Sequence, residues 1–444
     1  MKHSIIIAAM GILLLSNSTR LEAQKTKNLP LDEAVQLAVK NSGSLKIAIS
    51  REDEAMARYR ETINNRLPDV KVSAAYMRVA SPQIDLKTNS GSKADTSSKS
   101  ASSMPNVDQL AYGMANVSLP LFSGFRIKYG VESAKYLEQA ARLDAEQNKE
   151  ELTELTINAY INLFKNRKSL ELIEENLKQQ KQRVTDFTNL EKNGLLARND
   201  LLKAQLAQSN IELALLDAQN NLKMTYISMN LLLGLPEDTE LIPDSEFGST
   251  GEAGSAAAWE QTALTKRKDI EAISLREKAA SSAVKSVKGE YYPGIALTGG
   301  YIAADIPGFL TISNALNAGI GLQYNLGALW KTGAKVAEAK AKLYQTQVSQ
   351  NMLSDQIKTQ VNRSYHDYLL ANQKIEVYTR ATEQANENYR ITKNKFDNNL
   401  VTTTDLLEAD VMQLQAKLNL MFSKADAFAA YKKLQQTSGT LLEK

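Results

Sequence analysis

The stretch Arg51-Glu-Asp-Glu-Ala55 returns 225 residues later as Arg276-Glu-Lys-Ala-Ala280. It lies within two segments, residues 34–76 and 259–301, that align without a gap at this offset. Repetition on this scale indicates that the chain consists of two copies of one structural unit.

Two further motifs recur in the same order. Leu119-Pro-Leu-Phe-Ser-Gly124 corresponds to Leu322-Gln-Tyr-Asn-Leu-Gly327, and Asp200-Leu-Leu-Lys-Ala204 corresponds to Asp405-Leu-Leu-Glu-Ala409. Each copy therefore follows the order helix, strand, loop, strand, very long helix, turn and long helix. We expect a signal peptide at residues 1–23, a first repeat at 24–235, a linker at 236–258 and a second repeat at 259–444.

The composition argues against an enzyme. Cysteine is absent and only two histidines occur, His3 and His366, so thiol chemistry and cysteine-based zinc sites are excluded. The net charge is +3 with basic and acidic residues interleaved, which gives no indication of a nucleic-acid partner. We expect no catalytic residues, no metal site and no cofactor.

The N-terminus has the pattern of a secretory signal, with Lys2 before an apolar run from Ile5 to Leu15 and cleavage expected after Ala23. This run is too short for a membrane-spanning helix, and no later segment is long and apolar enough to be one. The protein is therefore expected to be exported without a helical membrane anchor.

Four segments alternate apolar and polar residues as strands do. They lie near residues 70–76, 116–121, 295–301 and 320–326. A long polar loop, Ser81–Asp108, joins the first two; if these strands span a membrane, it is expected to face the outside of the cell. A shorter loop near residues 305–314 joins the second two.

Very long helices are predicted after each strand pair. No proline occurs from Phe125 to about Lys192, or from Thr332 to about Asn394. A helix of ~65 residues is on the order of 100 Å long and needs neighbours to be stable. Helices of about 35 residues follow at 199–233 and 404–436.

Strands of this length can cross a bilayer when tilted. An open four-stranded sheet would leave its edge N–H and C=O groups without partners in lipid, so other copies of the chain would have to close it. The alternative is a soluble sheet that caps a helical rod. The signal peptide, the long helices and the duplicated hairpins favour the membrane interpretation.

The ordered motifs resemble TolC-type outer-membrane efflux proteins over essentially the whole mature chain. The resemblance implies an α+β membrane protein in which three chains form a twelve-stranded transmembrane β-barrel and a periplasmic α-barrel. The motifs that carry it are Leu29–Asn41, Leu67-Pro68, Ala75-Tyr76, Leu119–Gly124, Gly194–Ala204 and Leu231–Gly234.

The resemblance also implies a passive exit duct for efflux or type I secretion. Its expected partners are two further copies of the chain, outer-membrane lipid, a periplasmic adaptor (membrane fusion) protein and, through it, an inner-membrane RND or ABC pump. The expected location is the outer membrane with a large periplasmic extension. The alternative function is a periplasmic coiled-coil adaptor or scaffold, although an adaptor would carry one helical hairpin between lipoyl-like segments rather than two repeats.

Channels of this family narrow at their periplasmic end and carry inward-facing acids there. Asp405 and Glu408 match those acidic positions. Acids three residues apart share a helix face, so three copies would place six carboxylates around the axis. The alternative is that they are ordinary first-turn acids of a helix. Family members hold this end shut with a tyrosine and an arginine, where this chain has Phe396 and Val401, which cannot form those polar bonds. Substitute contacts are expected from Lys393, Asn394, Lys395 or Asn398.

The turns between the long helices are expected to contact the adaptor. The alternative is that their leucines only close the turns. The residues are Gly194, Leu195, Leu196, Asn399 and Leu400. Aromatic residues near the strand ends (Tyr291, Tyr292, Tyr301 and Trp330) suggest an interfacial girdle or, equally, core packing.

Overall fold

The computed structural model describes residues 26–78, 80, 108–244, 251, 254–307 and 310–442. The predicted signal peptide and the Ser81–Asp108 loop, except Asp108, lie outside these residues. The described chain divides into two compact units. One comprises the residues up to Ile49, Asp144–Ile270 and those from Leu353 onward; the other comprises Ser50–Leu143 and Glu271–Met352.

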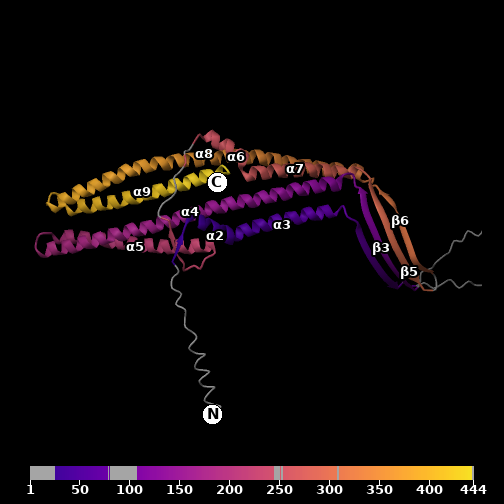
Figure 1. The fold of residues 1–444 in the computed structure, drawn as a ribbon, viewed down its shortest axis with the longest axis horizontal. Coiled ribbons are helices and arrows are strands. Elements are labelled where there is room, and N and C mark those ends of the chain that lie inside the picture. The colour runs from indigo at the N-terminus through magenta and orange to yellow at the C-terminus, as the bar shows by residue number, and fades with distance from the viewer. Residues whose placement is uncertain are drawn as a thin grey trace, which may run out of the picture. The chain divides into compact units, whose positions relative to one another are not determined.

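The duplication predicted from the sequence is confirmed by the order of elements (Figure 1). The fold is mostly helical, and two helices, two antiparallel strands and a long helical hairpin occur twice in the same order. The first copy contains α2 (Leu31–Asn41), α3 (Gly43–Asn64), β2 (Asp69–Arg78), β3 (Gln109–Phe122), α4 (Arg126–Lys192) and α5 (Arg198–Leu233). The second contains α6 (Ala256–Lys266), α7 (Lys268–Lys288), η1 (Gly289–Tyr291), β5 (Gly294–Ile306), β6 (Leu310–Gln323), α8 (Ala328–Asp397) and α9 (Thr403–Thr437).

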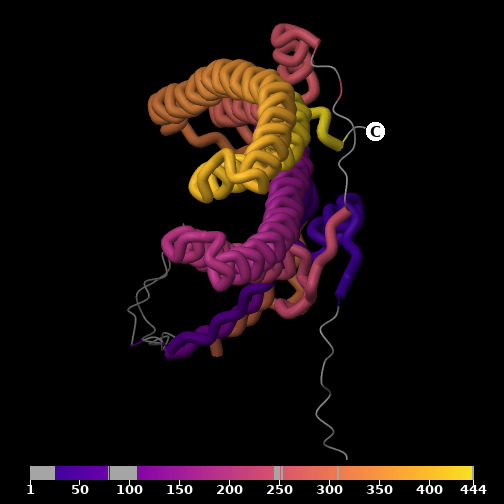
Figure 2. The backbone as a smooth tube through the Cα atoms, turned by 90° about the vertical axis from the view of Figure 1, so that its left-hand side faces the viewer, coloured from indigo at the N-terminus to yellow at the C-terminus, as the bar shows by residue number. Residues whose placement is uncertain are grey.

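The long helices are continuous, as predicted. Helix α4 has 67 residues and α8 has 70. Each turns back at its C-terminal end into a shorter partner, α5 or α9 (Figure 2). Among the described residues, no helix has both the length and the apolar character needed to cross a membrane.

Several details differ from the sequence-based expectations. The helical region near residues 29–65 is broken at Ser42, whose extended backbone (ψ 125°) separates α2 from α3. The last strand ends at Gln323 rather than continuing to residue 326, and the predicted loop at 305–314 is mostly strand. Two short strands, β1 (Thr26–Leu29) and β4 (Glu240–Pro243), pair in parallel, and at four residues each they were too short to show a periodic pattern.

The four long strands form one antiparallel sheet in the order β2-β3-β5-β6. The cross-strand pairs Val72–Ala115, Ala115–Tyr301 and Tyr301–Leu316 belong to a single face, because directly paired residues point to the same side. This face is apolar and much of it is exposed, with Val72 at 79% and Leu316 at 80%. Further exposed residues on it are Val70, Tyr76, Val117, Leu297, Ile320 and Leu322.

The alternation in β3 breaks at its end. Strict alternation over residues 116–121 would put Leu121 on the apolar face, but a bulge between Pro120 and Phe122 brings Phe122 opposite Ile295 instead. The outer strands β2 and β6 each have only one neighbour among the described strands. The sheet therefore has two open edges and one uncovered apolar face.

The core of the unit that includes α5 and α9 surrounds Tyr160 of α4, which is 1% exposed. Its hydroxyl donates to the Leu29 carbonyl of β1 (2.9 Å) and accepts from the amide of Asp244 just after β4 (2.8 Å). Burial raises the pKa of Tyr160 to about 12, so it remains a neutral hydrogen-bond donor at ordinary pH. This single side chain connects both short strands to the long helix.

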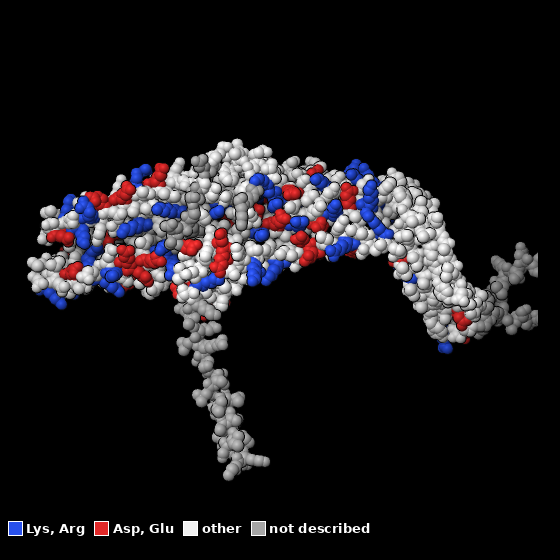
Figure 3. Space-filling view, viewed as in Figure 1, with Lys and Arg blue, Asp and Glu red and all other residues white. Residues whose placement is uncertain are grey.

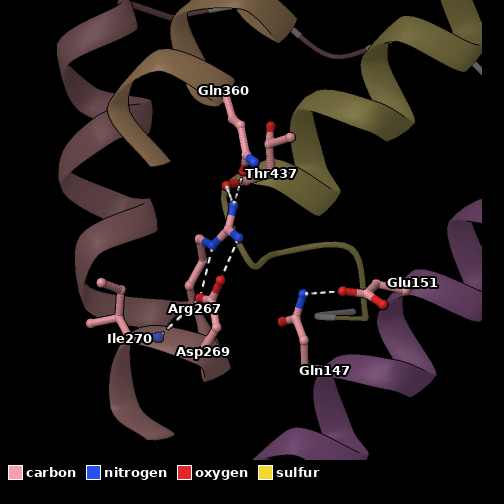
Figure 4. A network of polar contacts seen from close by, with 7 residues as sticks. All are labelled: Gln147, Glu151, Arg267, Asp269, Ile270, Gln360 and Thr437. Atoms are coloured by element: carbon pink, nitrogen blue, oxygen red, sulfur yellow. Dashed lines mark hydrogen bonds and ion pairs between the residues drawn. The ribbon is translucent and has the colours of Figure 1, made fainter. Parts of the chain in front are cut away.

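The two copies end in matching corners. Helix α5 ends at Gly234 against Asn41, whose side chain donates to the Leu233 carbonyl (2.6 Å), and α9 ends near Gly439 against Arg267. Arg267 is nearly buried and binds Asp269 through two nitrogens (3.0 and 2.6 Å), while also donating to the carbonyl of Thr437 (3.0 Å) (Figure 4). The C-terminal end of each helical hairpin is therefore fixed to the start of its own copy.

We expect Gly234→Ala and Gly439→Ala to destabilise the protein by about 1–2 kcal/mol each. Both glycines have left-handed backbone (φ 69° and 73°), and an added Cβ would lie 2.8 Å from Asn41 or 3.1 Å from the Arg267 backbone. The thermal unfolding midpoint would measure the loss. Gly43→Ala is the control, because that glycine has open space around it and lies in a helix; an equal loss there would contradict the explanation.

Candidate functional site

The turns at the tips of the two hairpins have the same geometry. Gly194 and Asn399 both have left-handed backbone, with φ of 71° and 60°. The following amides of Leu195 and Leu400 donate to carbonyls five residues earlier, at 2.9 and 2.8 Å, which is the hydrogen-bond pattern of a Schellman motif. Asparagine tolerates this conformation better than most residues other than glycine, which explains Asn399 in the second copy.

The leucines of these turns have different environments. Leu195 and Leu400 are each 72% exposed, whereas Leu196 packs against a buried cluster. Closing the turns therefore accounts for Leu196 but not for Leu195 and Leu400. That cluster consists of Phe187, Leu201, Ala204 and Leu406, with Val184, Leu190, Leu196, Tyr389 and Phe396 packed against it.

Phe396 takes part in aromatic packing. Its ring stacks on that of Phe187 of α4, with centroids 5.3 Å apart and planes at 27°. The contact joins α8 to α4 near the tip through apolar surface. Val401, also named from the sequence, is half-buried in the turn before α9. Of the expected substitutes, Asn398, just past the end of α8, donates to the backbone carbonyl of Asn394 (2.7 Å), a local bond.

Asp405 has a local structural role. Thr402 and Asp405 form a capping box at the start of α9: the Asp405 carboxylate accepts from the Thr402 hydroxyl (2.6 Å) and amide (2.8 Å). These hydrogen bonds, chiefly that from the hydroxyl, lower the pKa of Asp405. Asp405 and Glu408 are both exposed and lie three residues apart on α9. The structure thus gives Asp405 its helix-start function and leaves both carboxylates accessible.

The first copy differs at the same positions. Ala197 precedes α5 and offers no side-chain cap, and Lys203 stands where the second copy has Glu408. The Lys203 ammonium donates to Asp200 (3.2 Å) and to Thr404 of α9 (3.2 Å). Lys203 therefore bridges the second turn of α5 to the first turn of α9, and of the two copies only the second has acids at both matching positions.

A buried polar network lies about two to three helical turns from the tips. Arg183 of α4 donates to Asp410 of α9 (2.9 Å), to Tyr389 of α8 (3.0 Å) and to Gln180 (2.8 Å). Gln180 in turn donates to the carbonyl of Ala204 in α5 (3.2 Å). The side chains of Arg183 and Asp410 are only 9% and 4% exposed. All four helices of the two hairpins meet in this network.

This network was not predicted, although the sequence contains a signal for it. Asp410 lies one turn beyond Leu406, and Arg183 one turn before Phe187, so both charges occupy positions on buried helix faces. A buried charge requires a partner, and two such charges of opposite sign predict each other. A pattern of apolar residues alone does not reveal such a pair.

We expect Arg183→Met to destabilise the protein by roughly 3–5 kcal/mol, because it leaves the Asp410 carboxylate buried without its partner. The double change Arg183→Met with Asp410→Leu should lose less, since neither charge then remains buried. Unfolding midpoints of the two variants and of the single Asp410→Leu variant would provide the comparison. A double variant less stable than Arg183→Met would mean that the pair itself is strongly stabilising.

Comparison with known proteins places these features in a family. The model of the outer membrane efflux protein family matches residues 34–235 and 259–440. No curated protein matches the sequence. Among solved structures, the outer-membrane channel OprN (19% identity, TM-score 0.77) is matched over 92% of this chain and 89% of its own.

Two further channels have the same fold. VceC from Vibrio cholerae is 18% identical with a TM-score of 0.76, over 92% of this chain and 96% of its own. CmeC from Campylobacter jejuni is 16% identical with a TM-score of 0.76, over 93% of this chain and 86% of its own. The repeated helix and strand order, the four-stranded sheet with an exposed apolar face and the family match lead to one conclusion: the chain belongs to the outer membrane efflux protein family.

Proposed function

We propose that three copies of this chain form a passive exit duct across the outer membrane, with the long helices extending into the periplasm. The sheet carries the argument. Its apolar face is exposed and both edge strands lack a second partner among the described strands. Lipid satisfies an apolar face but not an edge N–H or C=O group, so a membrane-inserted sheet must be closed by further strands.

The helices support an assembly of the same kind. Helix α5 exposes leucines and a methionine at spacings of about one or two turns, including Leu206 at 65% and Leu213 at 61%. An apolar stripe of this length on a long helix is typical of a helix that packs against neighbours. Other exposed members are Leu202, Leu216, Met224 and Leu231. In the proposed trimer, helices of adjacent chains cover them.

The proposed duct works within a tripartite system, joined through a periplasmic adaptor to an inner-membrane RND or ABC pump, for efflux or type I secretion. The exposed Leu195 and Leu400 at two tips of identical geometry support an adaptor contact there, because a partner would cover them. The contact would also involve Gly194, Leu196 and Asn399. The buried Arg183 network would keep the tip of each chain intact where Phe396 and Val401 lack polar bonds.

Single-channel recording of the purified full-length protein in planar lipid tests this proposal, together with cross-linking to determine the oligomeric state. A duct gives discrete conductance steps and a cross-linked trimer. A mature protein that remains soluble and monomeric without detergent, and that gives no conductance, would instead support the scaffold alternative.

Lysine substitutions should distinguish the two faces of the sheet. Leu119 and Leu322 lie on the apolar face, opposite Leu297 and Ile295, whereas Ser118 and Gln323 lie on the other face. Leu119 and Leu322 lie near the helix-side ends of β3 and β6. Lysine there should cost about 1 kcal/mol, less than the roughly 2–4 kcal/mol expected at mid-membrane, and should reduce the yield of trimer. Lysine at Ser118 or Gln323, which would face the lumen, should be tolerated; equal tolerance at all four positions would contradict the barrel.

The charges of Asp405 and Glu408 are expected to focus cations in the closed tip. Replacing both with alanine should raise conductance and weaken block by multivalent cations. Because Asp405 also caps α9, the sharper variant is Asp405→Asn with Glu408→Gln, which removes the charges and retains hydrogen-bonding side chains. Asp217→Asn with Glu212→Gln on α5 is the charge-matched control. If the double alanine variant and the Asp405→Asn with Glu408→Gln variant both keep wild-type block and selectivity, the two acids serve only to start the helix.

A further inference from the structure

Positive charge is concentrated where the strands meet the helices. Nine-residue segments adjoin the sheet at 60–68 and 285–293, before β2 and β5, and at 123–131 and 324–332, after β3 and β6. They contain seven basic residues and two acidic ones, an excess of five, whereas the whole chain carries only +3. The basic residues, all exposed, are Arg60, Arg66, Arg126, Lys128, Lys285, Lys288 and Lys331.

The acids of these segments do little to neutralise this excess. Glu290 is already paired with Lys335, which lies just beyond the last segment (2.7 Å). Glu61 is the other acid. The described residues at the opposite end of the sheet include Arg78, Asp108 and Asp305, with no such surplus. In the space-filling view, basic side chains lie beside the sheet end, while the strands are almost without charge (Figure 3).

Two of the lysines converge on one aromatic ring. The ammonium groups of Lys128 and Lys285 lie 5.8 and 5.5 Å from the centroid of Tyr129, although they come from different helices, α4 and α7. The negative face of an aromatic ring attracts a cation, which accounts for both contacts. Both lysines are also exposed, so their ammonium groups remain accessible to a negatively charged group.

Large apolar side chains adjoin these cations. Phe125 is 50% exposed, Tyr292 57% and Trp330 70%. Phe125 adopts left-handed backbone (φ 65°) and packs edge-on against Phe122, the last residue of β3. A tryptophan, other aromatics and lysines at the boundary of an apolar surface match a membrane interface, where rings lie at headgroup depth and ammonium groups reach phosphates.

We propose that this junction binds the headgroups of anionic phospholipids, with Lys128 and Lys285 over Tyr129 as its central contact and Trp330 in the interface. The occupant is a phospholipid of the bilayer rather than a free phosphate, because the cations adjoin the exposed apolar face of β2, β3, β5 and β6. This inference rests on the proposed membrane insertion of the sheet. It adds a lipid preference and its location.

Trp330 itself reports on the site. The chain has two tryptophans, Trp259 and Trp330, so Trp259→Phe leaves a single fluorophore at the junction. The full-length protein is reconstituted in vesicles that contain brominated phosphatidylglycerol or brominated phosphatidylcholine at the same mole fraction. Stronger quenching by the anionic lipid is expected, corresponding to about fivefold tighter relative binding, since one lysine near an anionic surface contributes on the order of 1 kcal/mol.

Lys128→Gln with Lys285→Gln should bring the two lipids to nearly equal quenching, and so should high salt. Lys223→Gln with Lys374→Gln, exposed lysines of α5 and α8 away from the strand–helix junctions, should leave the preference unchanged. Equal quenching by both lipids in the Trp259→Phe protein would overturn the proposal, as would a preference that survives the Lys128 and Lys285 changes.

Conductance in the same lipids separates this test from that of the proposed function. Normal conductance with equal quenching would reject the lipid site and retain the duct. Absence of both conductance and quenching would reject the lipid site together with the membrane insertion on which it depends.

Discussion

The backbone groups at the edges of the four-stranded sheet set the central constraint on this protein. Strands β2 and β6 each pair on one side only, and the apolar face between them is open over its length. In water, the exposed apolar face would be unfavourable, whereas in lipid the unpaired N–H and C=O groups of the edge strands would be. The proposed barrel, in which further strands continue the sheet within a membrane, resolves both together. The exposed apolar stripe on α5 likewise needs other helices to pack against it, and adjacent chains of the proposed trimer would provide them.

The two copies share one order of helices and strands, and the candidate acidic pair lies where their side chains differ. The tips have nearly identical backbones, with Gly194 and Asn399 in the same conformation and Leu195 and Leu400 equally exposed. One turn later the copies diverge. The second presents Asp405 and Glu408, whereas the first uses Lys203 to bridge to Thr404. A charge pattern required by the helix start alone would appear in both copies.

Two kinds of contact join the two hairpins of a chain near their tips. The stack of Phe187 on Phe396 is apolar, and the network around Arg183 is polar but almost fully buried. A buried ion pair contributes little net stability compared with apolar packing, yet breaking it is costly. The network therefore favours one arrangement of α4, α5, α8 and α9 over alternatives with similar apolar contacts.

The sequence by itself determined the duplication, the four strands, the four long helices and the family, because these depend on periodicity over many residues and on motif order. The sequence did not predict the helix break at Ser42, the bulge in β3 or the short β1–β4 pair, since each involves one to four residues and leaves no period to detect. For the candidate site, the sequence predicted the two turns and put Asp405 and Glu408 on one helix face, and the constriction they would form stays a prediction. Only the tertiary structure showed that Asp405 caps its helix, that Phe396 stacks on Phe187, and that Arg183 meets Asp410 across 227 residues of chain. Such pairings depend on which helix faces meet, and that is decided by packing in three dimensions.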